Sequence, residues 1–442
     1  MQKTFIFYKL LHHPCDIGNI KRINKYGGIL NNLGTLSVER STLSGNTANR
    51  AGGGIEANVG TTTLAGVELT GNDAGQAPGN GGGLHLTGAG TVEVLQSTVT
   101  DNTAVEGGGL WNSSGGTFTV RGTSLEGNSA SGAEADQGGG AIYSDGGTTE
   151  VLGSDLVDNS ATGAAGSGGG ILNKGGSLVV RRSVLDGNDA QRAGGGIESS
   201  AGSTEVFRTD LLGNDAGAAP GNGGGLHLTG AGTVDVAQST VSGNTAVEGG
   251  GLWNSSGGTF SISDTVVEGN TATGDAATQG GGGVYNDGVM TITGSTIDDN
   301  TATGASGSGG GVLNNGEGTN PATLTIEDTT FDGNTSSRAG GAVETNAGTL
   351  VINDVDMTGN DTGAAPGNGG GLHVTGAATV TWDGGTVTGN NAANEGGGLW
   401  NSATGSITAT NLVVTGNTAP DGPDVFNVGG PFTLNGTPVP AS

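Results

Sequence analysis

Cysteine is almost missing from this chain of 442 residues: Cys15 is the only one, so no disulfide framework can hold the fold together. Proline occurs only ten times, and the 96 glycines follow no strict Gly-X-Y period, which excludes a collagen triple helix. No apolar run reaches the roughly 18 residues that a membrane-spanning helix needs. The fold must therefore form without disulfides, without a collagen helix and without a membrane-spanning helix, in a chain unusually rich in glycine.

Basic residues are also scarce, with 14 Lys plus Arg against 41 Asp plus Glu and a net charge of −27. Nucleic acids and anionic membranes are recognised through basic patches, so neither is expected as a partner. We expect no cofactor. Calcium at Asp/Asn turns is the alternative, although the Gly-Gly-x-Gly-x-Asp nonapeptide of calcium-binding rolls is missing.

A short unit of two or three glycines and a branched apolar residue recurs along the whole chain at intervals of 26 to 32 residues. Such a period is typical of a solenoid, in which each coil buries its apolar residues against the next. The repeated apolar residue, called the anchor below, is found at Ile29, Ile55, Leu84, Leu110, Ile142, Ile171, Ile197, Leu226, Leu252, Val284, Val312, Val343, Leu372 and Leu399, with a degenerate copy at Val425.

Between anchors the sequence alternates apolar and polar residues over short stretches, as in residues 35–38 and 117–120. Alternation bounded by Gly and Asn predicts strands, and no window has a helical period. Short strands of one coil can pair only with the same strands of the next coil. We therefore predict an all-β, right-handed, single-stranded parallel β-helix of about 14–15 coils with three short strands per coil.

One asparagine recurs in each coil, three residues after a buried apolar position. Stacked carboxamides can hydrogen-bond from coil to coil, and Asn also tolerates the left-handed backbone of a tight turn. We expect a structural ladder, formed by Asn46, Asn72, Asn102, Asn128, Asn159, Asn188, Asn214, Asn244, Asn270, Asn300, Asn334, Asn360, Asn390 and Asn417.

A longer repeat of five coils lies over the first, because residues 79–86 return at 221–228 and 367–374. We expect an atypical N-terminal segment or cap at 1–26, a β-helix at 27–430 and a C-terminal tail at 431–442. The five-coil blocks fall at about 27–168, 169–309 and 310–430. Residues 1–26 hold five of the 14 basic residues and show no clear signal-peptide cleavage pattern.

The repeat resembles that of chlamydial-type polymorphic outer membrane proteins, which pair Gly-Gly-Ala-[Ile/Leu/Val] with Phe-x-x-Asn. Residues 139–142 and 340–343 match the first motif literally, and residues 331–334 match the second. The wider likeness is to bacterial right-handed β-helix proteins of the pectin-lyase-like superfamily, over about residues 27–430. The resemblance implies an extracellular or cell-surface, adhesin-like or structural protein.

The position after each anchor points away from the solenoid interior if the anchor points inward. These positions spell Glu-His-Trp-Tyr almost three times, and exposed aromatics beside carboxylates can bind sugars. We therefore expect glycans or host or neighbour-cell receptors as partners along an exposed stripe; the alternative is coil-to-coil aromatic stacking that only stabilises the strands. The stripe consists of Glu56, His85, Trp111, Tyr143, Glu198, His227, Trp253, Tyr285, Glu344, His373 and Trp400.

A carbohydrate-active enzyme, such as a polysaccharide lyase or hydrolase, is the second hypothesis, because such enzymes use this fold. They need clustered carboxylates, and lyases add a basic residue. Here the acids are scattered, often beside the asparagine ladder, as at Asp73, Asp158, Asp189 and Asp299. We expect no catalytic residues, and no metal site, because the histidines of the stripe lie five coils apart.

Overall fold

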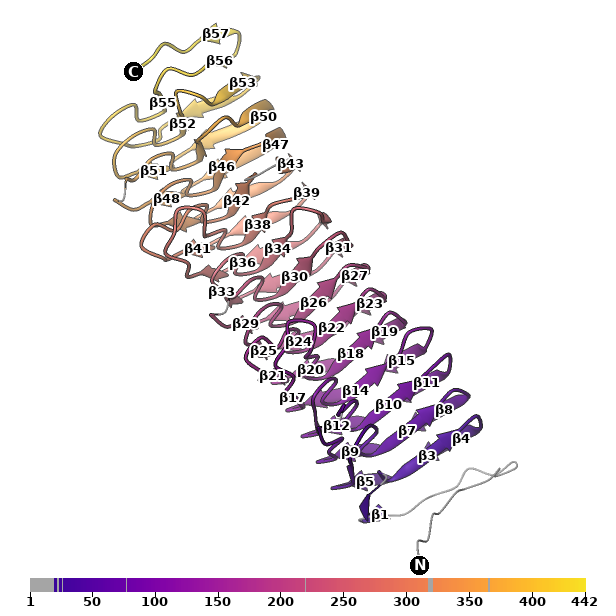
Figure 1. Ribbon diagram of the computed structural model, residues 1–442. Coiled ribbons are helices and arrows are strands. Elements are labelled where there is room, and N and C mark those ends of the chain that lie inside the picture. Colours follow the sequence, from indigo (N-terminus) through magenta and orange to yellow (C-terminus); the bar gives the residue numbers. More distant parts are fainter. Residues whose placement is uncertain are drawn as a thin grey trace, which may run out of the picture. The chain divides into compact units, whose positions relative to one another are not determined.

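The computed structural model describes residues 20–21, 24–25 and 27–442, apart from residues 77, 219, 317–320 and 365. The chain divides into two compact units, Met1–Asp210 and Leu211–Ser442. The described residues form short strands and no helix, and so none that could cross a membrane. Figure 1 shows these strands following one another coil by coil.

Most coils contain four strands rather than the predicted three, whereas two coils have three because their second and third strands are continuous as β47 (Thr349–Thr358) and β50 (Thr379–Thr388). In residues 84–104 the four strands are β10 (Leu84–Thr87), β11 (Thr91–Leu95), β12 (Thr98–Thr100) and β13 (Thr103–Ala104). The additional strand follows the asparagine turn and has only two residues, which is too short to show apolar alternation in a sequence.

Each strand pairs in parallel with its counterparts in the coils before and after. Thus β11 pairs with β8 (Thr61–Ala65) and with β15 (Thr117–Arg121), while β13 pairs with β17 (Ser129–Ala130). Second and third strands share one sheet, called the wide sheet here, and fourth strands form another, the narrow sheet. The predicted parallel β-solenoid is confirmed, with about 14 turns.

The first strands carry the anchors and form the anchor sheet. In Met1–Asp210 they are β3 (Ile29–Asn32), β7 (Ile55–Asn58), β10, β14 (Leu110–Asn112), β18 (Ile142–Asp145), β22 (Ile171–Lys174) and β26 (Ile197–Ser200). In Leu211–Ser442 they are β30 (Leu226–Thr229), β34 (Leu252–Asn254), β38 (Val284–Asn286), β42 (Val312–Asn315), β46 (Val343–Ala347), β49 (Leu372–Val374), β52 (Leu399–Asn401) and β55 (Val425–Asn427).

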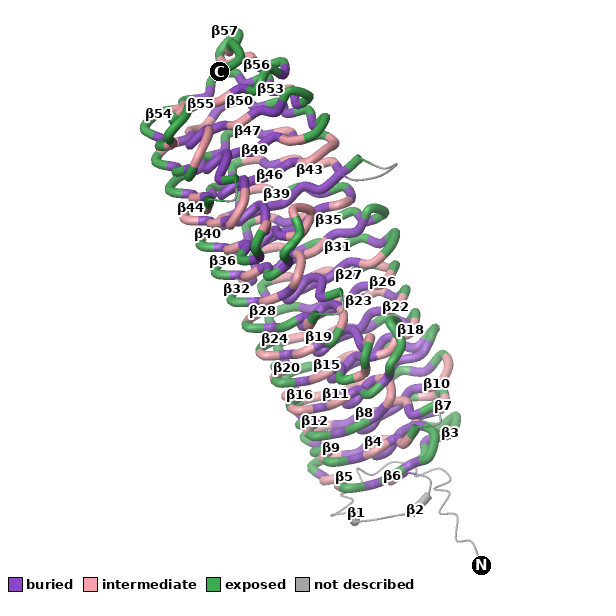
Figure 2. The backbone as a smooth tube through the Cα atoms, turned by 60° about the vertical axis from the view of Figure 1, so that its left-hand side comes forward, coloured by how far each residue is buried: buried purple, intermediate pink, exposed green. Residues whose placement is uncertain are grey.

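The core lies inside the coils, as the buried segments in Figure 2 show. The anchors from Ile55 to Leu399 are fully buried, and so are the apolar residues three positions before each asparagine, from Leu43 to Val387. Alternate residues of the second strands complete the interior, including Trp382, whose indole nitrogen donates to the carbonyl of Gly384.

The predicted asparagine column is present and is hydrogen-bonded from coil to coil. Asn102 Nδ2 donates to Asn128 Oδ1 (3.0 Å) and to the carbonyl of Leu69 (2.8 Å), while its Oδ1 accepts from the backbone N and Nδ2 of Asn72. At the end of the column, Asp424 Oδ1 accepts both bonds from Asn417 in place of another asparagine.

The left-handed backbone of this turn lies one residue earlier than the sequence suggested. The residue before each asparagine has a positive φ: it is a glycine at most coils, such as Gly71 (60°), and an aspartate at Asp101, Asp158 and Asp299 (53° each). The asparagines themselves are absent from the positive-φ positions. Their recurrence therefore comes from hydrogen bonding alone.

Strands occur in the described parts of both terminal segments, 1–26 and 431–442. The predicted N-terminal segment 1–26 lies largely outside the described residues; within it, β1 (Ile20–Lys21) pairs with β5 (Thr42–Ser44) and β2 (Asn24–Lys25) with β6 (Thr47–Ala48). In residues 431–442, β56 (Phe432–Leu434) adds to the wide sheet and β57 (Thr437–Pro438) folds back antiparallel.

Candidate functional site

The predicted stripe residues form a register column on the anchor sheet. In the first unit, strand pairing aligns Glu56, His85, Trp111, Tyr143, Leu172 and Glu198. In the second unit, it aligns His227, Trp253, Tyr285, Leu313, Glu344, His373 and Trp400. The sequence therefore identified the members of each column correctly.

The prediction that this column is exposed is wrong. Trp111 is 8% exposed, Tyr285 5% and Tyr143 1%, and His85, Glu198, His227, Glu344 and His373 are buried as well. Only Glu56, Trp253 and Trp400 are half-buried. The column points away from the solenoid interior, but most of its side chains do not reach open solvent.

The loops between the narrow sheet and the anchor sheet explain this burial, because their polar groups bind the column. Tyr143 Oη donates to the carbonyl of Asp136 at 2.9 Å. The indole nitrogens of Trp111 and Trp400 donate to Glu106 and Glu395 at 3.3 and 2.9 Å. Each of these partners lies in the loop that precedes the strand, so the loops fold over the column.

Aromatic rings of adjacent coils stack within the column. The ring centroids of His85 and Trp111 are 4.4 Å apart, and those of Trp111 and Tyr143 are 5.9 Å apart with nearly parallel planes. The second unit repeats this in Trp253–Tyr285 (5.4 Å) and His373–Trp400 (4.3 Å). With Leu172, Trp111 and Tyr143 form a small apolar cluster, so the column is a second core outside the main one.

Ion pairs anchor the glutamates of the column to arginines of the covering loops. Arg50 Nη1 lies 2.9 Å from Glu56 Oε1, and Arg192 lies 3.7 Å from Glu198. In the third block, Arg338 Nη1 contacts both oxygens of Glu344 at 2.7 and 3.0 Å, and His373 Nδ1 lies 3.5 Å from Glu344.

Burial shifts the pKa values of these groups. It raises the pKa of Glu56, Glu106 and Glu248, because desolvation penalises each carboxylate more than its donors stabilise it. Burial, with a smaller contribution from Arg50, lowers the pKa of His85 to about 3. Burial also acts to raise the pKa of Glu344, but His373 and Arg338 outweigh it and hold that pKa below its ordinary value.

This column can pack and pair charges, but it offers no exposed aromatic platform to a sugar ring. The burial was missed because the direction of a side chain from its strand says nothing about which loop covers it. Two segments already stood out as long in the sequence, residues 129–137 and 271–279, and each ends six residues before a tyrosine of the column, Tyr143 or Tyr285. That loop length was the available signal.

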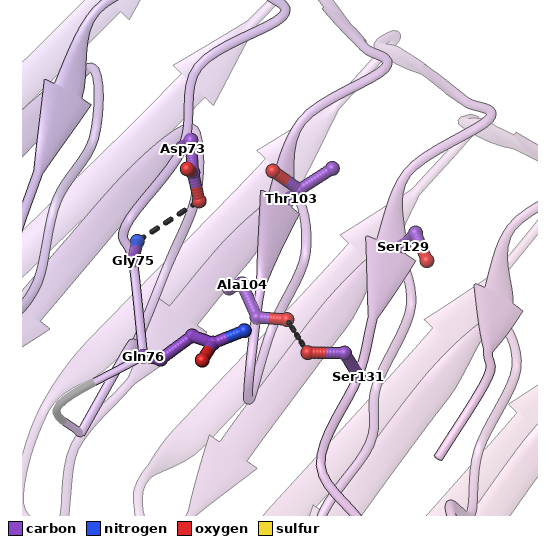
Figure 3. Close-up of a pocket in the computed structure, with 7 residues that line it drawn as sticks. All are labelled: Asp73, Gly75, Gln76, Thr103, Ala104, Ser129 and Ser131. Carbon is purple, nitrogen blue, oxygen red and sulfur yellow. Dashed lines mark hydrogen bonds between the residues drawn. The ribbon is translucent and has the colours of Figure 1, made fainter.

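A shallow polar recess opens elsewhere on the first unit, at the narrow sheet (Figure 3). It encloses about 260 Å³ and is lined by Asp73, Gly75, Gln76, Thr103, Ala104, Ser129 and Ser131. Asp73 Oδ1 accepts the backbone N–H of Gly75 at 2.9 Å, and Ser131 Oγ donates to the carbonyl of Ala104 at 3.1 Å. The lining therefore presents a carboxylate, an amide and several hydroxyls.

No group of three or more His, Cys, Asp or Glu side chains with metal-binding geometry occurs among the residues that the structure describes. Asp158 and Asp299, two of the acids beside the asparagine ladder, occupy left-handed turn positions. Asp73 lines the recess, and Asp189 lies on the narrow sheet with a pKa raised by burial.

The family model of the Chlamydia polymorphic membrane protein repeat matches residues 328–346. This stretch contains Phe331 and Val343, both fully buried, and Asn334 of the ladder. Searches of curated proteins and of solved structures give no match. Together with the parallel solenoid, the match supports a β-helix protein whose repeats are similar to those of polymorphic membrane proteins.

Proposed function

We propose that this chain is a non-enzymatic, adhesin-like protein of the cell surface or the extracellular space, which binds glycans of a neighbouring cell. The match at residues 328–346 to a repeat of membrane proteins is the observation that carries this proposal. The matched coil has the same buried positions and the same ladder as the other described coils, so the motif represents the architecture of the whole array.

The polar recess, rather than the aromatic column, is the better place for glycan contact. Sugar hydroxyls both donate and accept hydrogen bonds, and the recess offers the Asp73 carboxylate as acceptor, the Gln76 amide, and the hydroxyls of Thr103, Ser129 and Ser131. Its volume of about 260 Å³ suits one sugar ring rather than a long chain.

The five-coil repeat supplies a natural control for this recess. Asp73 corresponds to Asp215 and Asp361 in the other two blocks, but Gln76 corresponds to Ala218 and Ala364. Alanine is therefore compatible with the fold at this position. Gln76→Ala therefore removes the side-chain amide while the loop keeps its conformation.

A glycan array probed with the wild-type chain, Gln76→Ala and Asp73→Asn tests the proposal. We expect a set of bound glycans whose signal falls about tenfold or more in either variant, as loss of one or two hydrogen bonds to a ligand implies. Thr119→Ala, on the outer face of the wide sheet, serves as the control that keeps full binding. Absence of any bound glycan, or binding that survives both recess variants, would refute the proposal.

A further inference from the structure

The corner of the wide sheet between the second-strand and third-strand segments of each coil carries exposed charges of one sign in each unit. In the first unit, this corner closes β15 (Thr117–Arg121), β19 (Thr148–Leu152), β23 (Ser177–Arg181) and β27 (Ser203–Phe207). Strand register aligns Arg121 with Leu152, Arg181 and Phe207. We call Arg121, Arg181, Arg182 and Arg208, all exposed, the basic corner.

The same corner of the second unit is acidic. It belongs to β35 (Thr259–Ser263), β39 (Val289–Thr293), β43 (Thr323–Glu327), β47 (Thr349–Thr358) and β50 (Thr379–Thr388). Register aligns Ser263, Thr293, Glu327, Asn353 and Asp383. The acidic corner comprises Asp264, Glu327, Asp328, Asp354 and Asp383, of which only Glu327 is half-buried and the others are exposed.

The second unit supplies no cation for its own acidic corner. Residues 211–442 contain 21 Asp plus Glu and a single basic residue, Arg338, which is bound to the buried Glu344. Asp383 accepts hydrogen bonds from Thr410 and Asn411 at 2.7 Å each, and these bonds lower its pKa, so its charge is retained. A neutralising partner has to bring its own basic groups at matching intervals.

The basic corner has such groups at matching intervals. Arg181 Nη2 forms an ion pair with Glu205 Oε1 at 2.7 Å. Because both side chains are well exposed, this ion pair is weak, and Arg181 can exchange it for another partner. Successive coils are spaced by about 4.8 Å, so the basic corner spans about 14 Å and the acidic corner about 19 Å. Two solenoid corners with the same repeat distance can align several opposite charges at once.

We propose that the basic corner of one copy docks on the acidic corner of a second copy, so that the protein self-associates. Each copy carries a net charge of −27, and the copies repel at long range. At physiological salt the screening length is about 8 Å, so pairs in contact outweigh distant charges. The contact is polar and narrow, and the association is therefore weak and salt-dependent.

The turn position of the corner allows charge reversal without a change of backbone. Arg182 and Arg208 have φ values of 51° and 50°, while Asp328 and Asp354 have 47° and 48°. Since this left-handed position holds Arg in one unit and Asp in the other, each residue type is compatible with it. Two double variants follow: Arg182→Asp with Arg208→Asp reverses charges of the basic corner, and Asp328→Arg with Asp354→Arg reverses charges of the acidic corner.

Sedimentation velocity over a range of protein concentrations tests the proposal on the full chain. We expect wild type to form dimers or larger species at roughly 50 mM NaCl and to dissociate at roughly 500 mM. Each double reversal alone should raise the dissociation constant about tenfold or more, and the chain with all four changes should recover association, because the opposite charges meet again.

Circular dichroism of every variant provides the control for folding. A wild-type chain that stays monomeric at all concentrations would overturn the proposal. So would a fourfold variant that, although folded, does not regain association. Binding of added oligolysine to the acidic corner with no self-association would equally count against a second copy as the partner.

Discussion

In each coil a single asparagine supplies hydrogen-bond partners to buried backbone and side-chain groups at a glycine-rich turn. Asn102 is fully buried and accepts two hydrogen bonds while donating two. Its loss removes one hydrogen bond from the Leu69 carbonyl, and it leaves the backbone N–H of Asn72 and one of the two Nδ2 hydrogens of Asn72 without an acceptor in a buried turn. Buried groups without partners are costly, so the ladder is a main source of coil-to-coil stability.

Asn102→Ala should therefore lower the free energy of unfolding by about 3 kcal/mol, measured by chemical denaturation. The neighbouring change Asp101→Gly provides a control of opposite sign, because it relieves a side chain from a left-handed backbone with a φ of 53°. That change should stabilise the protein by up to about 1 kcal/mol. If both changes shifted the unfolding free energy by the same amount in the same direction, the asparagine could not be the hydrogen-bonding residue and its neighbour only the turn residue.

Histidine burial makes the first block sensitive to acid. The pKa of His85 is about 3 in the folded chain because of burial and Arg50, against 6.5 as its ordinary value. Below pH 6.5 His85 is protonated in the unfolded chain, whereas in the folded chain it stays neutral until about pH 3. Stability is therefore lost as pH falls through this window, by about 1.4 kcal/mol per pH unit.

His85→Gln should flatten the loss of stability between pH 6 and 4 relative to wild type, because glutamine binds no proton in either state. Urea unfolding at several pH values measures the difference between the two proteins, in which the contributions of the other titrating groups cancel. Parallel pH profiles for the two proteins would show that His85 is accessible to protons in the folded chain.

At the scale of the strand, the aromatic column works as packing between the anchor sheet and its covering loops. Trp111→Ala removes stacking on both His85 and Tyr143. We expect a loss of about 3 kcal/mol or more in unfolding free energy, as for other large buried side chains. Hydrogen exchange should rise in β10, β14 and β18.

Thr119→Ala is the matched control, since Thr119 lies in β15 on the outer face of the wide sheet. Its effect should stay within about 0.5 kcal/mol. A Trp111→Ala protein as stable as this control would mean that the loops do not cover the column.

These strands also show what a sequence can and cannot predict. The anchors and the apolar residues before each asparagine were identified because buried positions recur with the coil period, as in Leu84 and Leu110. The two-residue strand Thr103–Ala104 was missed because alternation cannot appear in two residues. The burial of Trp111 was missed because it depends on the path of a loop that includes Glu106.

At the scale of the molecule, both units are stacks of coils, and every functional hypothesis depends on like residues forming columns. The buried aromatic column, the asparagine ladder and the charged corners are all consequences of that stacking. The five-coil repeat multiplies each feature, but not identically: Gln76 has alanine counterparts, and the basic residues concentrate before Asp210. Function is therefore expected from what differs between blocks, at the recess and at the corners.

Distances between spin labels on the outer face of the wide sheet test the stacking most directly. Strand register places Ser37, Thr63, Glu93, Thr119, Glu150, Val179 and Glu205 in one column of the first unit. In a Cys15→Ser background, one spin label is placed at Ser37 and the second at Thr119, Glu150, Val179 or Glu205. Double electron–electron resonance should then give label-to-label distances of about 14, 19, 24 and 29 Å, respectively. Distances that do not increase by about 4.8 Å per coil would contradict the account.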